Sequence, residues 1–253
     1  MILDKFSLSN KVAIVTGASR GIGQGIAIGL AEAGADIVGV ATREMKETQQ
    51  QVEALGRKFL EVRADLGSLD VVDVIVKAAL AKFGKIDILV NNAGTIRRQP
   101  SLEFSVLNWD EVMNINLRTA FFLSQAVAKQ FVKQGHGGKI INTASMLSFQ
   151  GGILVPSYTA SKSALAGITK TMANEWAKYN INVNAIAPGY ISTDNTKAIR
   201  EDQARNQSIV ERIPAGRWGT PEDMKGAAVF LASEAGVYMQ GHILAVDGGW
   251  LAR

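Results

Sequence analysis

The segment "KVAIVTGASRGIGQGIAIGLAEAG", Lys11–Gly34, places a glycine-rich turn between a short apolar run and a stretch of helical period. The apolar run is rich in β-branched residues, which indicates a buried strand. Gly17, Gly21 and Gly23 let the chain turn tightly and bring backbone N–H groups close to a phosphate. Their Gly-x-x-x-Gly-x-Gly spacing differs from the commoner Gly-x-Gly-x-x-Gly form. A glycine-rich turn between a first strand and a helix favours dinucleotide binding.

The same alternation of strand and helix continues along the rest of the chain. Further apolar runs are "ADIVGV", "KFLEVRA", "KIDILVNNAG", "GKIINTAS", "NINVNAIAPG" and "HILAVDGG". Between them lie segments of helical period such as "LDVVDVIVKAALAKFG" and "RTAFFLSQAVAKQFVKQG". Seven apolar strands that alternate with amphipathic helices predict a buried parallel sheet covered on both faces. The predicted fold is therefore α/β, a Rossmann-type doubly wound sheet of seven strands.

Length and composition predict one domain with one irregular region. The chain has 253 residues, of which 47% are hydrophobic, and no composition break or linker divides it. We therefore expect a single dinucleotide-binding and catalytic domain over 1–253. Tyr190–Thr220 is polar, lacks a strand signal and is too long for an ordinary connection. Long insertions of that kind form lids or binding loops, so a substrate lid is expected at about 190–220.

Several classes of function are disfavoured by composition. There is no apolar run of about 18 residues, and "MILDKFSLSN" is too short and too polar for a leader, so we expect no membrane association. The chain has no cysteine and only His136 and His242, which leaves no thiolate or histidine-rich metal site and fits a cytoplasmic protein. Its net charge of +4 comes from scattered Lys and Arg, which disfavours nucleic-acid binding but suits an anionic cofactor.

The end of the second predicted strand bears on the choice of cofactor. An acidic residue there would bind the adenosine ribose hydroxyls and favour NAD(H). The segment "GVATRE" instead has Ala41, Thr42 and Arg43, and the glycine loop carries Arg20. Two arginines can neutralise the 2′-phosphate of NADP(H), although both can equally be solvated. NAD(H) and NADP(H) therefore both remain open.

Other polar motifs also follow predicted strands, where a doubly wound sheet binds its ligands. Asp65, in "ADL", can accept a hydrogen bond from an adenine amino group. Asn92 and Gly94, in "NNAG", can form a tight floor against the cofactor. Ser145 closes the fifth strand in "NTAS", and "PSYTASKSAL" follows it.

Together these motifs resemble the short-chain dehydrogenase/reductase family, and the resemblance covers the whole chain. The motifs that carry it are the glycine loop Gly17–Gly23, "NNAG" at Asn91–Gly94, Asn116, Ser145, Tyr158-x-x-x-Lys162, and Pro-Gly-x-x-x-Thr at Pro188–Thr193. The resemblance implies hydride transfer between a nicotinamide cofactor and a secondary alcohol or ketone. It also implies a cofactor site of Gly17, Ser19, Arg20, Gly21, Ile22, Gly23, Thr42, Arg43, Asp65, Leu66, Asn92, Ala93, Gly94, Tyr158, Lys162, Pro188, Gly189, Ile191 and Thr193.

The expected catalytic residues are Asn116, Ser145, Tyr158 and Lys162. Tyr158 and Lys162 are four residues apart, which places them on one face of a helix. A nearby ammonium and a positively charged nicotinamide both favour the phenolate and lower its pKa. Tyr158 can then remove the alcohol proton during oxidation or donate it during reduction. By the resemblance, Ser145 bonds the substrate oxygen, Lys162 binds the nicotinamide ribose, and Asn116 holds a relay water.

The substrate is expected to be a deoxy sugar acid. "GTIRRQ", "ASMLSFQGGILVPSY", "RIPAGRWG" and "AVDGGWLAR" are similar to bacterial family members that act on such acids, usually with NAD(H). Arginine offers a carboxylate two parallel hydrogen bonds. Arg97 is the first candidate, with Arg98, Arg212 and Arg217 as alternatives. Ser145, Tyr158 and Gln150 are the other expected substrate contacts.

Two alternative functions and one assembly also follow from the sequence. The runner-up activity is 3-oxoacyl-acyl-carrier-protein reduction, since the carrier would bind a basic surface. A cofactor-binding regulator without turnover is disfavoured by the intact serine, tyrosine and lysine. The predicted helices Leu117–Gln134 and Ser157–Lys178 carry more apolar surface than one sheet face needs. Because family members pair these helices, we expect a homotetramer.

Overall fold

The computed structural model describes residues 1–253 and contains one seven-stranded sheet with the order β3-β2-β1-β4-β5-β6-β7. All six strand pairs are parallel. The strands are β1 (Val12–Thr16), β2 (Asp36–Ala41), β3 (Phe59–Arg63), β4 (Ile88–Asn91), β5 (Gly138–Thr143), β6 (Ile181–Pro188) and β7 (Ile243–Val246). The predicted fold is confirmed.

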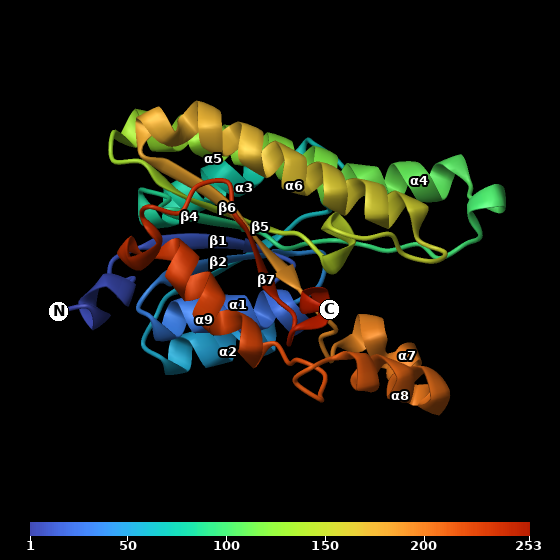
Figure 1. Cartoon of the computed structure of the whole chain (residues 1–253). Coiled ribbons are helices and arrows are strands. Elements are labelled where there is room, and N and C mark those ends of the chain that lie inside the picture. The colour runs from blue at the N-terminus through green and yellow to red at the C-terminus, as the bar shows by residue number, and fades with distance from the viewer.

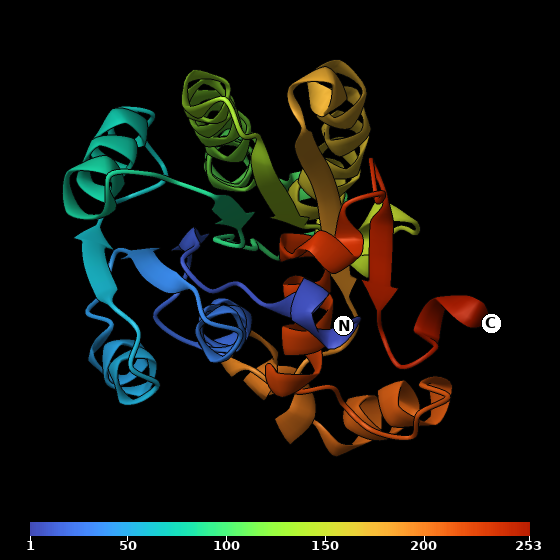
Figure 2. The same ribbon diagram turned by 90° about the vertical axis from the view of Figure 1, so that its left-hand side faces the viewer.

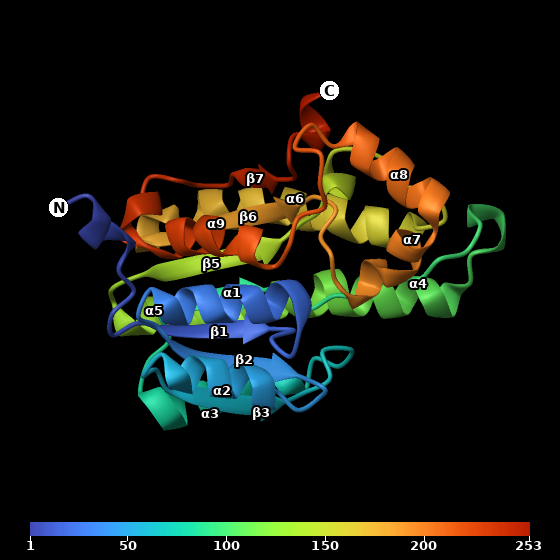
Figure 3. The same cartoon turned by 90° about the horizontal axis from the view of Figure 1, so that it is seen from below.

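Helices cover both faces of this sheet (Figures 1 and 2). Helices α3, α5 and α6 lie on one face, and α1, α2 and α9 lie on the other, as the view from below also shows (Figure 3). The helices are α1 (Gly21–Glu32), α2 (Lys46–Ala54), α3 (Val71–Phe83), α4 (Val106–Met113), α5 (Ala120–Gln134), α6 (Pro156–Trp176), α7 (Lys197–Glu201), α8 (Gln203–Arg212) and α9 (Glu222–Ala232).

The central strand explains why the chain needs helices on both faces. Successive side chains of a strand point to opposite faces. Ala13 and Val15 of β1 pack in a core with α1 and α9. Val12 and Ile14 pack in a second core with α3 and α5. Every position of β1 is buried, which explains the apolar run Val12–Val15 that the sequence assigns to a parallel sheet.

The strand order reverses between β1 and β4, because β1 pairs with β2 on one side and with β4 on the other. Such a switch point opens a crevice beyond the carboxyl ends of the strands. Helices α4, α7 and α8 extend past those ends (Figures 1 and 3). The fold therefore places its loops and projecting helices around one crevice.

The polar region expected at about 190–220 contains no regular strand and is largely helical. A single parallel bridge joins Ile191 to Gly219 at its base. Between these residues the chain forms a 3-10 turn, α7 and α8. Ile209 is the only buried residue of α8, which explains why the segment is so polar. No helix of the chain is long and apolar enough to cross a membrane.

Candidate active site

A cleft of about 1080 Å³ opens at the carboxyl ends of the strands. Its walls come from the loops after β1 to β6, from α6 and from the region 190–220. Most residues expected at a cofactor or substrate site line it, namely Gly17, Ser19, Arg20, Gly21, Ile22, Gly23, Thr42, Arg43, Asp65, Leu66, Asn92, Ala93, Gly94, Ser145, Gln150, Tyr158, Lys162, Gly189 and Thr193. Four other expected site residues lie outside this lining, namely Arg97, Asn116, Pro188 and Ile191. Pro188 and Ile191 are buried.

The glycine loop forms a cradle that side chains would fill. Gly17 has φ +69°, a conformation that favours glycine. A Cβ on Gly23 would lie 2.2 Å from the Gly17 carbonyl oxygen, and one on Gly17 would lie 2.8 Å from Asn92 Nδ2. No side-chain hydrogen bond caps the start of α1, so its first N–H groups are free to bind an anion. These residues fit the pyrophosphate of a dinucleotide.

The "NNAG" segment is the floor of the cleft. Asn92 Nδ2 donates to the Thr16 carbonyl at 3.0 Å, while Thr16 Oγ1 accepts from the N–H groups of Asn92 (2.9 Å) and Ala93 (3.0 Å). Asn91 Nδ2 donates to Ser124 Oγ at 2.8 Å and to Asn142 Oδ1 at 2.9 Å. These bonds join the ends of β1, β4 and β5 to α5, which makes the floor rigid.

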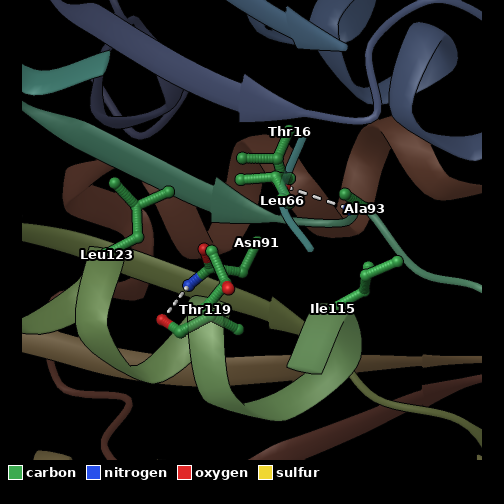
Figure 4. Close-up of a pocket in the computed structure, with 8 residues that line it drawn as sticks. Thr16, Leu66, Asn91, Ala93, Ile115, Thr119 and Leu123 are labelled. Carbon is green, nitrogen blue, oxygen red and sulfur yellow. Dashed lines mark hydrogen bonds between the residues drawn. The ribbon is translucent and has the colours of Figure 1, made fainter. Parts of the chain in front are cut away.

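A small cavity lies beneath this floor (Figure 4). Thr119 and Leu123 face Thr16, Leu66 and Ala93 across it. Its volume of about 10 Å³ matches about one water molecule, so it belongs to the packing of the floor and not to a substrate site.

The arginines of the glycine loop and of the segment after β2, Arg20 and Arg43, differ in their partners. Arg20 forms an ion pair with Asp194, at the start of the region 190–220. Arg43 takes part in no ion pair. The end of β2 therefore offers one unpaired guanidinium.

Helix α6 places Tyr158 and Lys162 in the cleft. Lys162 is 3% exposed, donates from Nζ to the Thr143 carbonyl at 2.6 Å, and lies 5.7 Å from the centroid of the Tyr158 ring. Ser145, at the end of β5, accepts a hydrogen bond from the Leu147 N–H at 3.1 Å. The sheet thus brings together residues that are 13 positions apart in the sequence.

Without a cofactor, the pKa of Tyr158 is shifted in the opposite direction from the lowering expected of Lys162 and a charged nicotinamide together. Burial raises the pKa of Tyr158 above its ordinary value, and the Ser145 hydroxyl and the Arg98 charge only partly oppose that shift. Burial also lowers the pKa of Lys162 to about 8. The reason is desolvation, which disfavours both charged forms. The positive charge of a bound oxidised nicotinamide would favour the phenolate and oppose this shift.

Asn116 lies in a π-helical turn, Asn114–Thr119, that precedes α5. Its Oδ1 accepts from the Thr95 N–H at 2.8 Å, and its Nδ2 donates to the Thr95 carbonyl at 2.9 Å and to Ser161 Oγ at 3.2 Å. Turns of this type are frequent at functional sites. Since the side chain is 1% exposed and its groups are engaged, it positions the Thr95 segment and α6. Its role with a relay water stays a prediction.

The structure separates the arginine candidates for a substrate carboxylate. The Arg97 guanidinium pairs with the Glu111 carboxylate, with Nε–Oε2 at 2.8 Å, and lies outside the lining of the cleft. Arg217 pairs with Asp223 at 2.7 Å. Four arginines line the cleft without forming an ion pair: Arg43 after β2, and Arg98, Arg205 and Arg212 elsewhere in the lining. The arrangement therefore favours Arg98 or Arg212 over Arg97.

Some residues of the cleft carry no signal in the sequence motifs. Arg205 comes from α8, and Trp250 comes from the last turn of the chain. Tyr190 contacts Trp218 and Trp250 edge-on, with ring centroids at 5.3 Å and 4.7 Å. The only sequence signal for Trp250 is its position in "GGW", shortly after the end of a strand, where ligands of such sheets bind.

The sequence and the structure of this chain are similar to those of named dehydrogenases over its whole length. A short-chain dehydrogenase family model described as enoyl-(acyl carrier protein) reductase matches residues 17–251. The 2-dehydro-3-deoxy-D-gluconate 5-dehydrogenases of Dickeya dadantii and Escherichia coli are 63% and 62% identical over 253 residues, with 100% of both chains covered. A crystal structure of gluconate 5-dehydrogenase from Burkholderia cenocepacia with NADP and tartrate has a TM-score of 0.94 at 39% identity, and the match covers 100% of each chain.

Proposed function

Because the chain belongs to the short-chain dehydrogenase/reductase family and is thus an NAD(P)-dependent oxidoreductase, we propose that it oxidises or forms a secondary alcohol of a deoxy sugar acid. The observation that carries this proposal is the set of unpaired guanidiniums that line the same cleft as Tyr158. A substrate carboxylate would pair with one of them through two parallel hydrogen bonds. Relatives named for 2-dehydro-3-deoxy-D-gluconate, and one structure that holds the hydroxy acid tartrate, support the same class.

The site residues take the following proposed roles. The nicotinamide of bound NAD(H) or NADP(H) accepts or supplies the hydride. Tyr158 Oη removes or returns the alcohol proton, Ser145 Oγ bonds the substrate oxygen, and Lys162 Nζ binds the nicotinamide ribose. The glycine loop holds the pyrophosphate, and Arg43 lies at the adenosine end. The region 190–220 acts as the lid over the substrate.

Steady-state assays on a small panel test this function. The panel contains 2-dehydro-3-deoxy-D-gluconate, 2-deoxy-D-gluconate, gluconate and, in the reducing direction, a 3-oxoacyl thioester, each with both cofactors. We expect the highest kcat/KM for a deoxy sugar acid. A preference for the thioester would instead identify an acyl reductase. Tight cofactor binding without turnover of any substrate would indicate a regulator.

We also propose that the protein is a cytoplasmic homotetramer. Support for the assembly comes from large apolar side chains exposed along α4 and α5, namely Val106, Leu107, Trp109, Phe122 and Val132. Closed symmetry would bury such faces in isologous interfaces. Sedimentation velocity at micromolar concentration should show a tetramer, and Phe122→Glu combined with Val132→Glu should shift it to smaller species. A wild-type monomer under these conditions would contradict the assembly.

A further inference from the structure

We infer that Arg212, stacked on the Trp250 indole, is the anchor for the substrate carboxylate, and that the end of the chain holds this anchor in place. The inference rests on the proposed sugar-acid function, and it makes Arg212 the residue that selects substrates with a carboxylate. Both side chains line the cleft, yet they come from the lid helix α8 and from the last turn of the chain, Trp250–Ala252.

The stacked geometry leaves Arg212 ready to bind an anion. The central guanidinium carbon lies 3.9 Å from the centroid of the Trp250 ring system, which is a close cation–π contact. Stacking occupies one face of the guanidinium and leaves the N–H donors at its edge available for a carboxylate. No carboxylate of the chain pairs with Arg212.

Trp250 is a rigid platform next to the catalytic serine. It is 5% exposed and packs with Met146, Ile209 and Ile213. Met146 directly follows Ser145 in the sequence, so the platform lies at the substrate end of the cleft. The indole N–H is buried without an acceptor, which leaves the face of the ring as the part of Trp250 that engages a polar group.

The last residue of the chain fixes the position of Arg212. Arg253 Nη2 donates to the Glu211 carbonyl at 2.6 Å, and Arg253 Nε donates to the Arg212 carbonyl at 3.1 Å. These carbonyls are among the last of α8, which have no partner within the helix. Asp247 Oδ2 accepts from the Leu251 N–H at 2.9 Å and holds the terminal turn itself. The tail therefore joins the platform and the helix that carries the anchor.

Preorganisation distinguishes Arg212 from the other unpaired arginines of the cleft. Arg43, Arg98 and Arg205 have no aromatic ring beneath their guanidinium groups, because the cation–π contacts of the chain involve Lys162, Lys178 and Arg212. A side chain that is already held loses less conformational entropy when it binds. Arg98 lies close enough to Tyr158 for its charge to act on the phenol, which assigns it to the reacting end of the substrate.

The test compares Arg212→Met with the wild type on two substrates. One is the sugar acid preferred in the panel, and the other is the alditol with CH₂OH in place of its carboxylate. Losing a charge-assisted hydrogen bond corresponds to a fall of about 10- to 150-fold in kcat/KM. We expect that loss for the acid and a change of less than about threefold for the alditol. Lys77→Met, which removes an exposed cation of α3 outside the lining of the cleft, controls for net charge and should leave both rates unchanged.

A double-mutant cycle tests the role of the tail. Arg253→Ala should raise KM for the acid, and the double variant with Arg212→Met should lose no more than Arg212→Met alone. Equal losses for acid and alditol, no loss with Arg212→Met, or additive losses in the cycle would overturn the inference. A selective loss with Arg98→Met instead would also overturn it. A wild type that turns over no sugar acid would overturn the proposed function as well.

Discussion

Replacement of Tyr158 by Phe is expected to lower kcat by about 10²–10⁴-fold in either direction while cofactor binding survives. Phenylalanine preserves the ring, which is partly buried in the cleft, but has no proton to exchange with the substrate oxygen. Turnover is measured with the best substrate of the panel, and cofactor affinity is measured separately by fluorescence or thermal shift. A variant that keeps more than about a tenth of the wild-type rate would mean that another group moves the proton.

The pH dependence of the wild type is the control for this role. Only the phenolate can accept a proton, and burial raises the pKa of Tyr158. The rate of oxidation should therefore increase as the pH rises above neutrality, and the residual rate of Tyr158→Phe should lack that increase. A wild-type profile that is flat into strongly alkaline solution, with hydride transfer rate-limiting, would contradict the assignment.

Replacement of Lys162 by Met is expected to lower activity strongly and to stabilise the free protein. Loss of one preorganised electrostatic contact typically costs about 10²–10³-fold in kcat. The stability effect follows from burial, which lowers the pKa of Lys162 from 10.5 to about 8. A shift of this size corresponds to about 3 kcal/mol of destabilisation when the lysine is charged. Loss of the hydrogen bond to the Thr143 carbonyl offsets about 1 kcal/mol of the gain.

The direction of the Lys162 pKa shift determines the pH at which the stability difference is largest. The folded pKa lies below the unfolded one, so the unfolded chain binds more protons between pH 8 and 10.5. The free energy of unfolding of the wild type should therefore increase as the pH rises through that window. Below the window, the cost of burying the charged Lys162 applies in full. Urea unfolding at pH 7 should show Lys162→Met to be more stable by about 2 kcal/mol, with most of the difference lost near pH 10.5. Equal stability at pH 7 would contradict the buried charge.

Much of the site follows from local patterns in the sequence. Glycines occupy these positions in the first loop because Gly17 has a positive φ and because a Cβ on Gly23 would clash with its neighbours. Both are local requirements of one turn. Tyr158 and Lys162 share a helix face because their spacing is four residues. Parallel strands end at one edge of the sheet, so motifs that follow strands meet there. These inferences need only the periods of helix and strand.

Local sequence patterns do not indicate which arginine is free to bind a substrate carboxylate. Arg97 and Arg98 are neighbours in the sequence, yet Arg97 pairs with Glu111, and Arg98 lines the cleft. The sequence favours Arg97, because no local pattern indicates that a carboxylate 14 residues away pairs with it. Likewise, charge alone predicts that Lys162 and the nicotinamide lower the pKa of Tyr158, whereas burial of Tyr158 and Lys162 determines the direction of their pKa shifts in the structure.

The sequence by itself thus determined the sheet and the order of its motifs, since both depend on residues close along the chain or on strand ends that topology must bring together. The role of Tyr158 and Lys162 as the acid–base pair stays a prediction. Only the tertiary structure decided which cations remain unpaired and what supports them. Arg212 and Trp250 are 38 positions apart, and their contact depends on how α8 and the terminal turn pack. Charge pairing and desolvation act through space, so they become visible only when the packed side chains are in place.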